Sequence, residues 1–340
     1  MTKKLKLYLL IFFIIETSIF SYDVCLSNCG KQKKANQVSS MSSYLWLSDN
    51  SVRNMSPTPG KGFYVIPCIH PEGTEVVFHG GTKGYCRIWK YDVEKDTALP
   101  LTSDEYSSVL PSYSWDGGSV VFSSDSDYDQ ERLDTNELGK TVSWQYVTLG
   151  GSPEYLNIYM MNSNGSDIQR ITQGKFLDFR ASFSPDKKTI IFLSNRGGEP
   201  DGLPRLWSVN TDGSKDPKPI LTEVGVGRPW YSVDGKWIFF FTDVKKRHTL
   251  CKMLLSGGEW EVISSDSVGL SSHGPFADPD GDHLWYHNKK DNRWRILRLS
   301  LKGGGPVEFI PPGFEGVSVA HPTRARNGNM TFDSPKLIVK

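Results

Sequence analysis

One short unit recurs along this sequence, and it constrains the fold more than any other feature. The unit is a turn with an acidic residue, usually followed by glycine, and then a strand of β-branched or aromatic residues, as in residues 234–240. Its acidic residues stand at intervals of 44, 70, 48 and 46 along the chain, at Glu72, Asp116, Asp186, Asp234 and Asp280. Intervals near 45 match one four-stranded blade of a β-propeller.

The rest of each unit also indicates antiparallel strands. Proline and aspartate favour the tight turn, and glycine tolerates the positive φ that such a turn often needs. The apolar runs after the turn suit strands that are packed on both faces. Second strands are predicted over residues 87–92, 156–162, 205–210, 249–255 and 294–301. The predicted fold class is therefore all-β.

A sixth copy of the unit is divided between the two ends of the chain. His321-Pro322 resembles His70-Pro71, and residues 329–332 supply the apolar strand after it. Residues 44–55 resemble the missing second half. A closed ring removes exposed sheet edges. We expect six blades, with seven as the main alternative, and a ring closed by pairing the N- and C-terminal strands.

Two segments carry a family resemblance. Residues 184–198, which begin Ser184-Pro185-Asp186, and residues 157–172, which contain Asn164-Gly165, resemble the Pro-Asp repeat of TolB-like six-bladed propellers, a WD40-like repeat family. The resemblance extends from about residue 43 to residue 340. It implies the propeller fold and is much less specific for function.

The first 21 residues are expected to be a signal peptide. Lys3, Lys4 and Lys6 precede an apolar run from Leu7 to Ile15, which is too short to cross a bilayer of about 30 Å. A transmembrane anchor and a lipid anchor at Cys25 are the less favoured alternatives. Residues 22–42 are expected to be a flexible linker and residues 43–340 the propeller. The protein is thus predicted to be periplasmic or secreted, not membrane-spanning, and monomeric.

Charge and cysteine usage exclude further classes. The chain has 39 basic and 38 acidic residues, for a net charge of +1, whereas a nucleic-acid binder normally carries a basic patch or stripe. No nucleic-acid partner is therefore expected. Cys25 and Cys29 could close a small loop, and buried thiols are the favoured interpretation for the cysteines in the repeats, Cys68, Cys86 and Cys251.

The candidate ligand-binding residues precede the repeat turns, because propellers usually bind ligands at the ends of the innermost strands. Arg180 and Arg228 each lie six positions before the acidic residue of their unit, and His273 lies seven before its own. With Trp230, they are predicted to line one mouth of the channel and to receive an anionic or carbonyl-bearing group. The alternative is that the two arginines pair with acidic residues of adjacent blades.

A metal site is the second hypothesis for the histidines. His70, His273 and His321 around one pore would suit a transition metal. When the repeats are aligned on the turn, however, His70 and His321 take the place of Ser184, Ser232 and Asp278, where turn capping is the simpler account. His79 and His287 are expected near a blade edge, away from the channel. No cofactor is assigned, and calcium or manganese is the divalent metal considered.

The second unit is longer than the others by about 25 residues. Its acidic segment, residues 124–131, resembles a calcium loop but lacks the glycine and the final acid of that motif, so a solvated loop is favoured. Trp144, Tyr146 and Tyr155 could form an aromatic lip over the channel.

Three functions are consistent with these features. The sequence lacks a nucleophile elbow, a P-loop and a His-Glu-x-x-His motif, so a peptidase is rejected. The favoured hypothesis is a non-enzymatic binding or scaffold module for a protein or glycan partner in the periplasm or cell envelope. The third function, a structural part of an envelope complex, differs from this favoured hypothesis only in the kind of partner. The alternative is a carbohydrate-active enzyme that resembles oligogalacturonate lyase, with a His-lined metal site in the channel.

Overall fold

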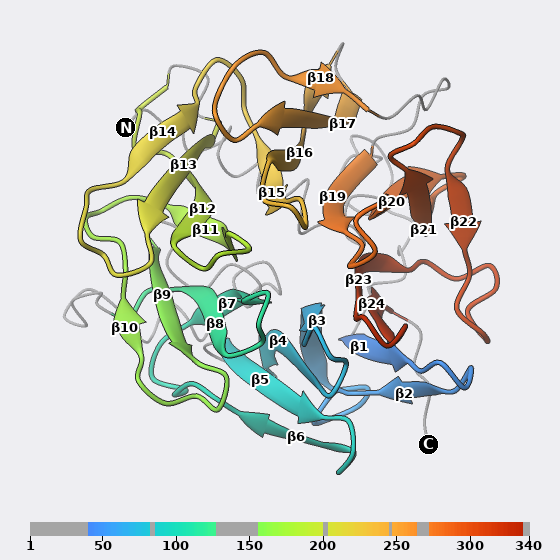
Figure 1. Ribbon diagram of the computed structural model, residues 1–340. Coiled ribbons are helices and arrows are strands. Elements are labelled where there is room, and N and C mark those ends of the chain that lie inside the picture. Colours follow the sequence, from blue (N-terminus) through green and yellow to red (C-terminus); the bar gives the residue numbers. More distant parts are fainter. Residues whose placement is uncertain are drawn as a thin grey trace, which may run out of the picture.

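The computed structural model describes residues 40–81, 86–126, 156–199, 203–244, 247–263 and 272–335 of the chain. The expected signal peptide, the Cys25–Cys29 pair, the aromatic lip and most of the acidic segment lie outside these residues. The described elements are β-strands, as the repeats predict, and their sheets surround a central axis (Figure 1). This arrangement confirms the all-β propeller architecture.

Four of the sheets have four strands each, paired antiparallel in chain order. The first contains β7 (Ser108–Tyr113), β8 (Ser119–Ser124), β9 (Asn157–Asn162) and β10 (Gln169–Arg170). The second contains β11 (Asp178–Phe183), β12 (Thr189–Ser194), β13 (Arg205–Asn210) and β14 (Lys218–Leu221). The third contains β15 (Gly227–Tyr231), β16 (Trp237–Val244), β17 (Arg247–Leu254) and β18 (Glu261–Val262). The fourth contains β19 (Ser272–Ala277), β20 (His283–Lys290), β21 (Arg293–Ser300) and β22 (Val307–Phe309).

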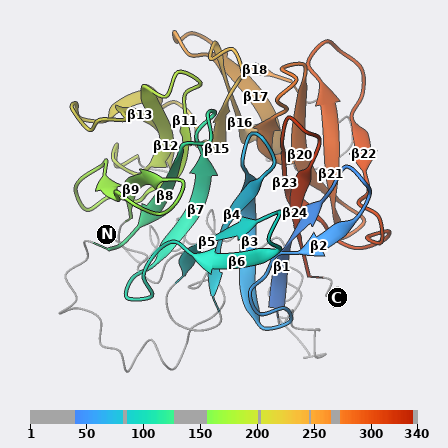
Figure 2. The ribbon, with the colours of Figure 1, turned by 60° about the horizontal axis from the view of Figure 1, so that its bottom comes forward.

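The fifth sheet has eight strands and contains both ends of the described chain. One half contains β23 (Ala320–Arg324), β24 (Met330–Ser334), β1 (Ser40–Trp46) and β2 (Val52–Asn54). The other half contains β3 (Gly62–Ile69), β4 (Glu75–Gly81), β5 (Arg87–Asp92) and β6 (Thr97–Pro100). Short parallel pairing of β1 with β3, at residues 40–41 and 62–63, joins the halves. The antiparallel pairing of β1 with β24 (Figure 2) is the pairing of terminal strands that the divided sixth unit predicts.

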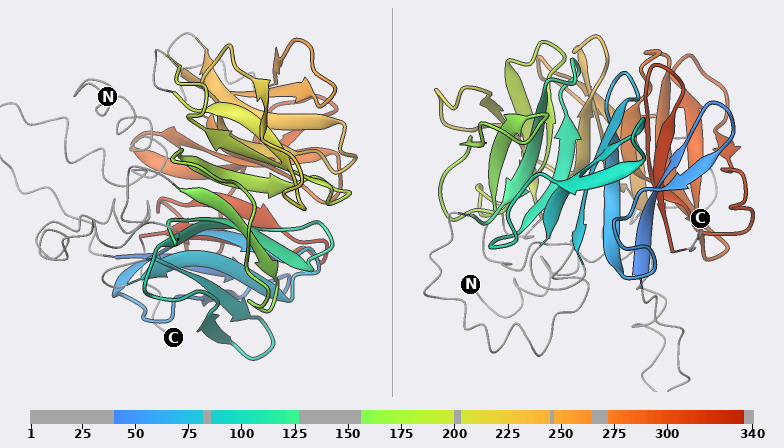
Figure 3. Two further views of the ribbon diagram at one scale, coloured as in Figure 1. Left: turned by 90° about the vertical axis from the view of Figure 1, so that its left-hand side faces the viewer. Right: turned by 90° about the horizontal axis from the view of Figure 1, so that it is seen from below.

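The first strand of each unit lies nearest the axis, as Figure 1 shows for β3, β7, β11, β15, β19 and β23. Each contacts the next, and β23 contacts β3, so these inner strands form a closed ring. The sheets stand side by side around them, as both views of Figure 3 show. The apolar runs are packed on both faces as expected, because Ile190, Ile191 and Phe192 on β12 are all fully buried.

Every inner strand carries a β-bulge at the same place in its pairing with the second strand of its unit. The second residue of each bulge has a positive φ, between 38° and 60°: Ile66, Leu110, Arg180, Arg228, Gly274 and His321. A positive φ is costly for any residue with a Cβ and most costly for a β-branched one such as Ile66. Bulges often re-aim side chains next to functional sites, which makes this position the one to inspect.

The repeat turns follow the inner strands and are capped by side chains, as predicted for most of them. The hydroxyl oxygens of Ser184 and Ser232 accept hydrogen bonds from the backbone five residues later, at 3.0 and 2.9 Å. His70 Nδ1 accepts one from the Glu72 N–H at 3.1 Å. His321 has no such role, because it lies on β23 and the turn of this unit begins at Ala325. The alignment of His321 with His70 is therefore wrong.

The predicted second strands agree closely with β5, β9, β13, β17 and β21, and the first and third of these match residue for residue. Strand β1 begins at Ser40, three residues before the expected start of the propeller. Cys68, Cys86 and Cys251 are buried and unpaired, which confirms the prediction for the cysteines of the repeats.

Candidate functional site

The bulges bring two arginine side chains to the axis. Arg180 on β11 and Arg228 on β15 line, with Ile66 on β3 and Leu110 on β7, a small hollow of about 20 Å³ that we call the bulge pocket. Trp230 also lines it. Each guanidinium-bearing residue is only 6% exposed. Three of the four predicted ligand-binding residues thus lie together.

Asp333 on β24 is a carboxylate on which both guanidinium groups act. Its Oδ2 accepts a hydrogen bond from the Ile66 N–H at 2.7 Å and lies 2.8 Å from His321 Nδ1. Its Oδ1 accepts the Ser43 hydroxyl at 2.9 Å. Burial raises the pKa of Asp333 to about 8, although these hydrogen bonds and the two guanidinium charges act to lower it. Two buried guanidinium groups therefore act on a buried acid that keeps its proton up to about pH 8.

His79 and His287 hold the same place on their strands as Asp333 does on β24. Each accepts, at Nδ1, a 3.4 Å hydrogen bond from the bulge residue of the next unit, Leu110 and His321 respectively. Both imidazoles are fully buried. The expectation that they lie near a blade edge is wrong, because a side chain in this place packs against the neighbouring inner strand. Burial and the two guanidinium charges lower the pKa of His287 well below its usual value.

His273 does not join the arginines, because Gly274 occupies the bulge position of β19. His273 Nδ1 instead lies 3.1 Å from His248 Nδ1, and its ring packs against Phe241 and Trp294. Neither pocket described here is lined by His273. Burial, followed by the neighbouring His248 and His287, lowers its pKa well below the usual value. The prediction that His273 lines the mouth with the arginines is therefore corrected.

Gly274 has a packing reason to lack a side chain. Its φ is +59°, and a Cβ at this position would lie 2.8 Å from His287 Cε1 and 3.0 Å from Arg228 Nη1. Both distances are too short for ordinary van der Waals contact. The absence of a Cβ on Gly274 therefore leaves room for the Arg228 side chain next to His287.

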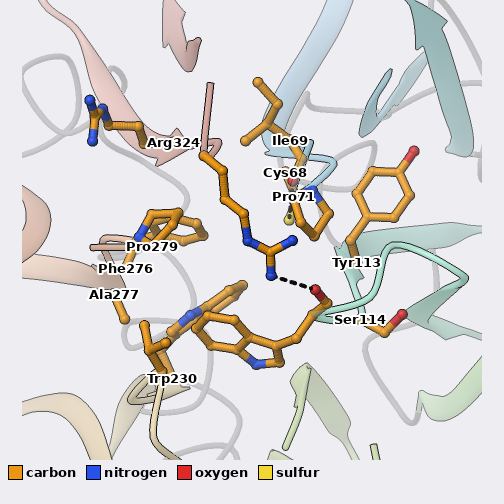
Figure 4. A pocket seen from close by; sticks show the side chains of 13 residues that line it. Cys68, Ile69, Pro71, Tyr113, Ser114, Trp230, Phe276, Ala277, Pro279 and Arg324 are labelled. Carbon is orange, nitrogen blue, oxygen red and sulfur yellow. Dashed lines mark hydrogen bonds between the residues drawn. The ribbon is translucent and has the colours of Figure 1, made fainter. Parts of the chain in front are cut away.

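A second hollow, of about 60 Å³ and partly open to solvent, lies where the inner strands run into the repeat turns. We call it the turn-side pocket; its lining includes Cys68, Tyr113, Trp115, Trp230, Phe276 and Arg324. Figure 4 shows the labelled side chains of this lining around the opening. Cys68 and Trp230 line the bulge pocket as well, so the two hollows adjoin along the channel.

Most polar side chains of the turn-side pocket already have partners. Arg324 Nη1 donates to Asp278 Oδ1 at 3.0 Å, and the Tyr113 hydroxyl donates to Glu75 at 3.3 Å. Arg326 pairs with Glu72 and donates to the Trp115 carbonyl at 3.2 Å.

Trp230 is different. It is 9% exposed and its indole N–H has no hydrogen-bond partner among the described residues. A buried donor without an acceptor is costly in a folded protein. Its position beside both pockets makes this N–H a candidate donor to a ligand.

The three histidines of the metal hypothesis do not meet. His273 and His321 each lie against His287, with ring centroids 5.7 and 4.8 Å away. His70 caps its turn and packs its ring against Tyr113 at 5.2 Å. Within the described part of the chain, no group of three histidine, cysteine or acidic side chains has the arrangement of a metal site.

Several residues of the site were not predicted. Asp333 could have been found, because it aligns with His79 and His287 once the last unit is placed correctly. Cys68 and Phe276 follow the bulges of β3 and β19 by two residues, as Trp230 follows that of β15. Arg324 and Arg326 carry no comparable signal in the sequence.

The described residues contain no helix that is long and apolar enough to span a bilayer. Comparison with known proteins gives a match between residues 145–309 and a family model of the TolB beta propeller domain. A solved structure assigned as TolB from Agrobacterium tumefaciens superposes with a TM-score of 0.63 at 15% identity, over 86% of this chain and 98% of that one.

Two further solved structures are similar. TolB from Acinetobacter baumannii gives a TM-score of 0.56 at 16% identity, over 88% of this chain and 65% of that one. An oligogalacturonate lyase from Vibrio parahaemolyticus gives 0.51 at 13% identity, over 83% and 80%. At these identities the likeness concerns the fold. Together with the family match and the ring of inner strands, it shows that the chain carries a TolB-like β-propeller.

Proposed function

We propose that this protein is an exported, non-enzymatic binding or scaffold module that receives a protein or glycan partner at one mouth of its channel. The observation that carries the proposal is the turn-side pocket, which shares Cys68 and Trp230 with the bulge pocket that Arg180 and Arg228 line. The unpartnered indole N–H of Trp230 lies where the two pockets adjoin. A preformed hollow with few converging polar groups is typical of a ligand site.

Six blades are part of this proposal. The halves of the eight-stranded sheet each pair antiparallel within themselves, and only a short parallel contact joins them. Counting each half as one blade supports a six-bladed ring around the six inner strands. Seven blades would require a seventh inner strand in the ring.

Export is proposed from residues 1–21. The expected result is that protein recovered from the periplasm or medium of a bacterial host lacks this segment, as intact-mass measurement can establish. Full-length protein retained in the cytoplasm or held in the membrane would contradict export.

The binding function is tested by calorimetric titration of the full chain with uronic-acid oligomers and with short peptides, in the presence and absence of manganese. We expect saturable binding without chemical change of the probe. Release of unsaturated oligomers, seen by ultraviolet absorbance, would contradict the proposal and favour the lyase alternative. The lyase alternative is supported by the likeness of the fold to an oligogalacturonate lyase. It gains no support from His70, His273 and His321, because these histidines do not lie together.

A further inference from the structure

The inner strands end in large side chains, with one exception. The last residue of each strand stands three positions after the bulge residue, and in chain order these residues are Ile69, Tyr113, Phe183, Tyr231, Ala277 and Arg324. The two tyrosines reach back to the preceding unit of the ring. The Tyr113 hydroxyl donates to Glu75 at 3.3 Å. The Tyr231 hydroxyl lies 3.0 Å from that of Thr189. Ala277 on β19 has no ring with which to fill the corresponding place.

A hollow of about 390 Å³ lies in this place, between the sheet of β15–β18 and the neighbouring sheet of β19–β22 (Figure 1). We call it the inter-sheet pocket; its lining includes Asp234 and Trp237 of one sheet and Leu301 of the other. Trp237 is the first residue of β16, as Thr189 is of β12. The pocket therefore corresponds to the space that the Tyr231 ring fills between the two preceding sheets. Its volume is within the range of small-ligand sites.

One wall of the inter-sheet pocket is aromatic. Trp237 and the buried Phe239 lie two residues apart on β16, so their side chains point to the same face of the sheet. The Lys252 ammonium lies 4.4 Å from the centre of the Trp237 ring and 2.9 Å from Glu261 Oε1. Because Lys252 is already paired, the wall offers packing surface for a ring rather than a charge for an anion.

Asp234 supplies an acceptor at the pocket. Its Oδ1 accepts the Ser232 hydroxyl at 2.6 Å and the Lys236 N–H at 3.1 Å, and these hydrogen bonds lower its pKa, so the side chain is charged. Its Oδ2 lies 3.8 Å from Lys236 Nζ, which is beyond hydrogen-bond distance. In the preceding unit, burial and then the nearby charge of Asp186 raise the pKa of Tyr231 to about 12. A phenol in the inter-sheet pocket would likewise lie near Asp234 and donate its hydroxyl to it.

Two exposed leucines flank this pocket. Leu301 lines it and is 36% exposed. Leu254 is 41% exposed and is paired with Trp237 across β16 and β17, so both side chains are on the same face. A free small phenol would leave the leucines in water, whereas the apolar neighbour of a tyrosine in a polypeptide would cover them.

From this arrangement we propose that the inter-sheet pocket binds the side chain of a tyrosine on a partner polypeptide, next to which stands an apolar residue. The phenol ring packs on the aromatic wall, and its hydroxyl donates to Asp234 Oδ2. The apolar neighbour covers the two leucines. This site adds to the binding function proposed above and is separate from the channel mouth, because among the described residues only Val233 lines both it and the turn-side pocket.

The test is calorimetric titration of the full chain with 4-methylphenol, which is the tyrosine side chain by itself, and with two short peptides that carry Tyr-Leu or Phe-Leu between glycines. We expect the tyrosine peptide to bind more tightly than 4-methylphenol, because it also covers the leucines. It should bind about tenfold more tightly than the phenylalanine peptide, which lacks the hydrogen bond to a charged group.

Asp234→Asn and Asp186→Asn form a matched pair of variants. Oδ1 of each carboxylate accepts a serine hydroxyl at 2.6 Å and a backbone N–H at 3.1 Å, so both variants disturb their turns alike. Beside Asp186, however, the space between the sheets is already filled by Tyr231. Asp234→Asn should weaken the tyrosine peptide about tenfold, to the affinity of the phenylalanine peptide, and Asp186→Asn should leave both affinities unchanged.

Ala277→Tyr tests the missing ring itself. A tyrosine from within the chain should fill the inter-sheet pocket and abolish binding of the tyrosine peptide. Ala277 also lines the turn-side pocket, so Trp230→Phe is measured beside it and should bind the tyrosine peptide as the wild type does. Should Ala277→Tyr not fold, the two aspartate variants still decide.

The outcomes separate this inference from the proposed function. Equal affinities of the tyrosine and phenylalanine peptides would overturn the assignment of tyrosine, and 4-methylphenol that binds as tightly as the peptide would overturn the choice of a polypeptide. Weaker binding in Trp230→Phe but not in Asp234→Asn would place the peptide at the channel mouth, which overturns the inference and leaves the proposed function. Binding of none of the three probes would also overturn the inference, and the titration with uronic-acid oligomers would then decide the proposed function by itself.

Discussion

At the residue scale, the bulge positions of the inner strands decide which side chains of this ring lie together in the channel. The spacing of six residues before the turn acid is the signal that places Arg180 and Arg228 together, and the structure agrees with it. His273 lies one residue before the bulge position. Its side chain therefore contacts His248 and does not lie with the two arginines. In an extended strand, consecutive side chains point to opposite faces, so an offset of one residue changes the neighbours completely.

Gly274→Ala is predicted to destabilise the protein because a Cβ would crowd His287 and Arg228 and because φ is positive there. We expect the free energy of unfolding to fall by about 1–3 kcal/mol in urea denaturation. Gly305→Ala is the control, since nothing lies within 4 Å of the added atom. Equal stability of the two variants would contradict the packing described for the bulge of β19.

At the element scale, the sequence predicts the strands well and the last unit poorly. The alternation of turn residues with apolar runs locates the second strands to within two residues. The repeat pattern predicts the final unit four residues too early, because Pro322 resembles the proline of a repeat turn. The true turn, residues 325–329, has neither proline nor an acid before its Gly328. A turn without its usual residues can form here because β24 is held by pairing with both β23 and β1.

Asp333→Asn is predicted to loosen the strands that join the two ends of the chain. The carboxylate accepts hydrogen bonds from β1 and β3, and an amide nitrogen in its place cannot accept them. We expect faster amide hydrogen exchange in β1 and β24 and a loss of about 1–3 kcal/mol in stability.

The matched control is Asp178→Asn. Asp178 is also fully buried, but its partners Ser194 and Arg196 belong to its own sheet and the turn after it, and its third partner, Thr172, follows β10. Faster exchange should then be confined to β11, β12 and the segment after β10. The same exchange pattern in both variants would contradict the role given to Asp333.

At the scale of the whole molecule, buried titratable groups on neighbouring sheets make stability depend on pH. Folding lowers the pKa of His273, His287 and His321 well below 6.5, so below that pH the unfolded chain binds up to three more protons than the folded chain. Asp333 opposes them between 3.8 and about 8, where the folded chain keeps a proton that the unfolded chain has released. Below pH 6.5 the three histidines together outweigh Asp333, so stability falls as the pH falls. Above pH 6.5 only the proton on Asp333 contributes, so stability falls as the pH rises.

These groups therefore predict a stability maximum near pH 6.5. Below it, the free energy of unfolding should fall with pH by about 1.4 kcal/mol per pH unit for each extra proton that the unfolded chain binds. Urea denaturation across this range gives the slope, and His273→Gln should reduce it by one proton. A slope that this variant leaves unchanged, or stability that keeps rising toward alkaline pH, would contradict the account.

The ligand site itself was only partly predictable, because it is assembled from several sheets. Arg180, Arg228 and Trp230 could be assigned from the repeat register, whereas Tyr113 and Arg324 meet Trp230 only when the ring closes. Which side chains along the channel retain an unused hydrogen-bonding group depends on three-dimensional partners that a repeat pattern does not contain. The indole N–H of Trp230 is the clearest case.

A binding site at the channel mouth is tested most directly by the calorimetric affinity of one ligand found in the titration for the wild type, Trp230→Phe and Trp207→Phe. Both tryptophans have a buried indole N–H without a partner among the described residues, but Trp207 lies on β13 and is not part of the lining of either pocket. We expect about fivefold weaker binding for Trp230→Phe, the cost of one hydrogen bond, and unchanged binding for Trp207→Phe. Equal affinities of all three proteins would contradict a binding site at the channel mouth.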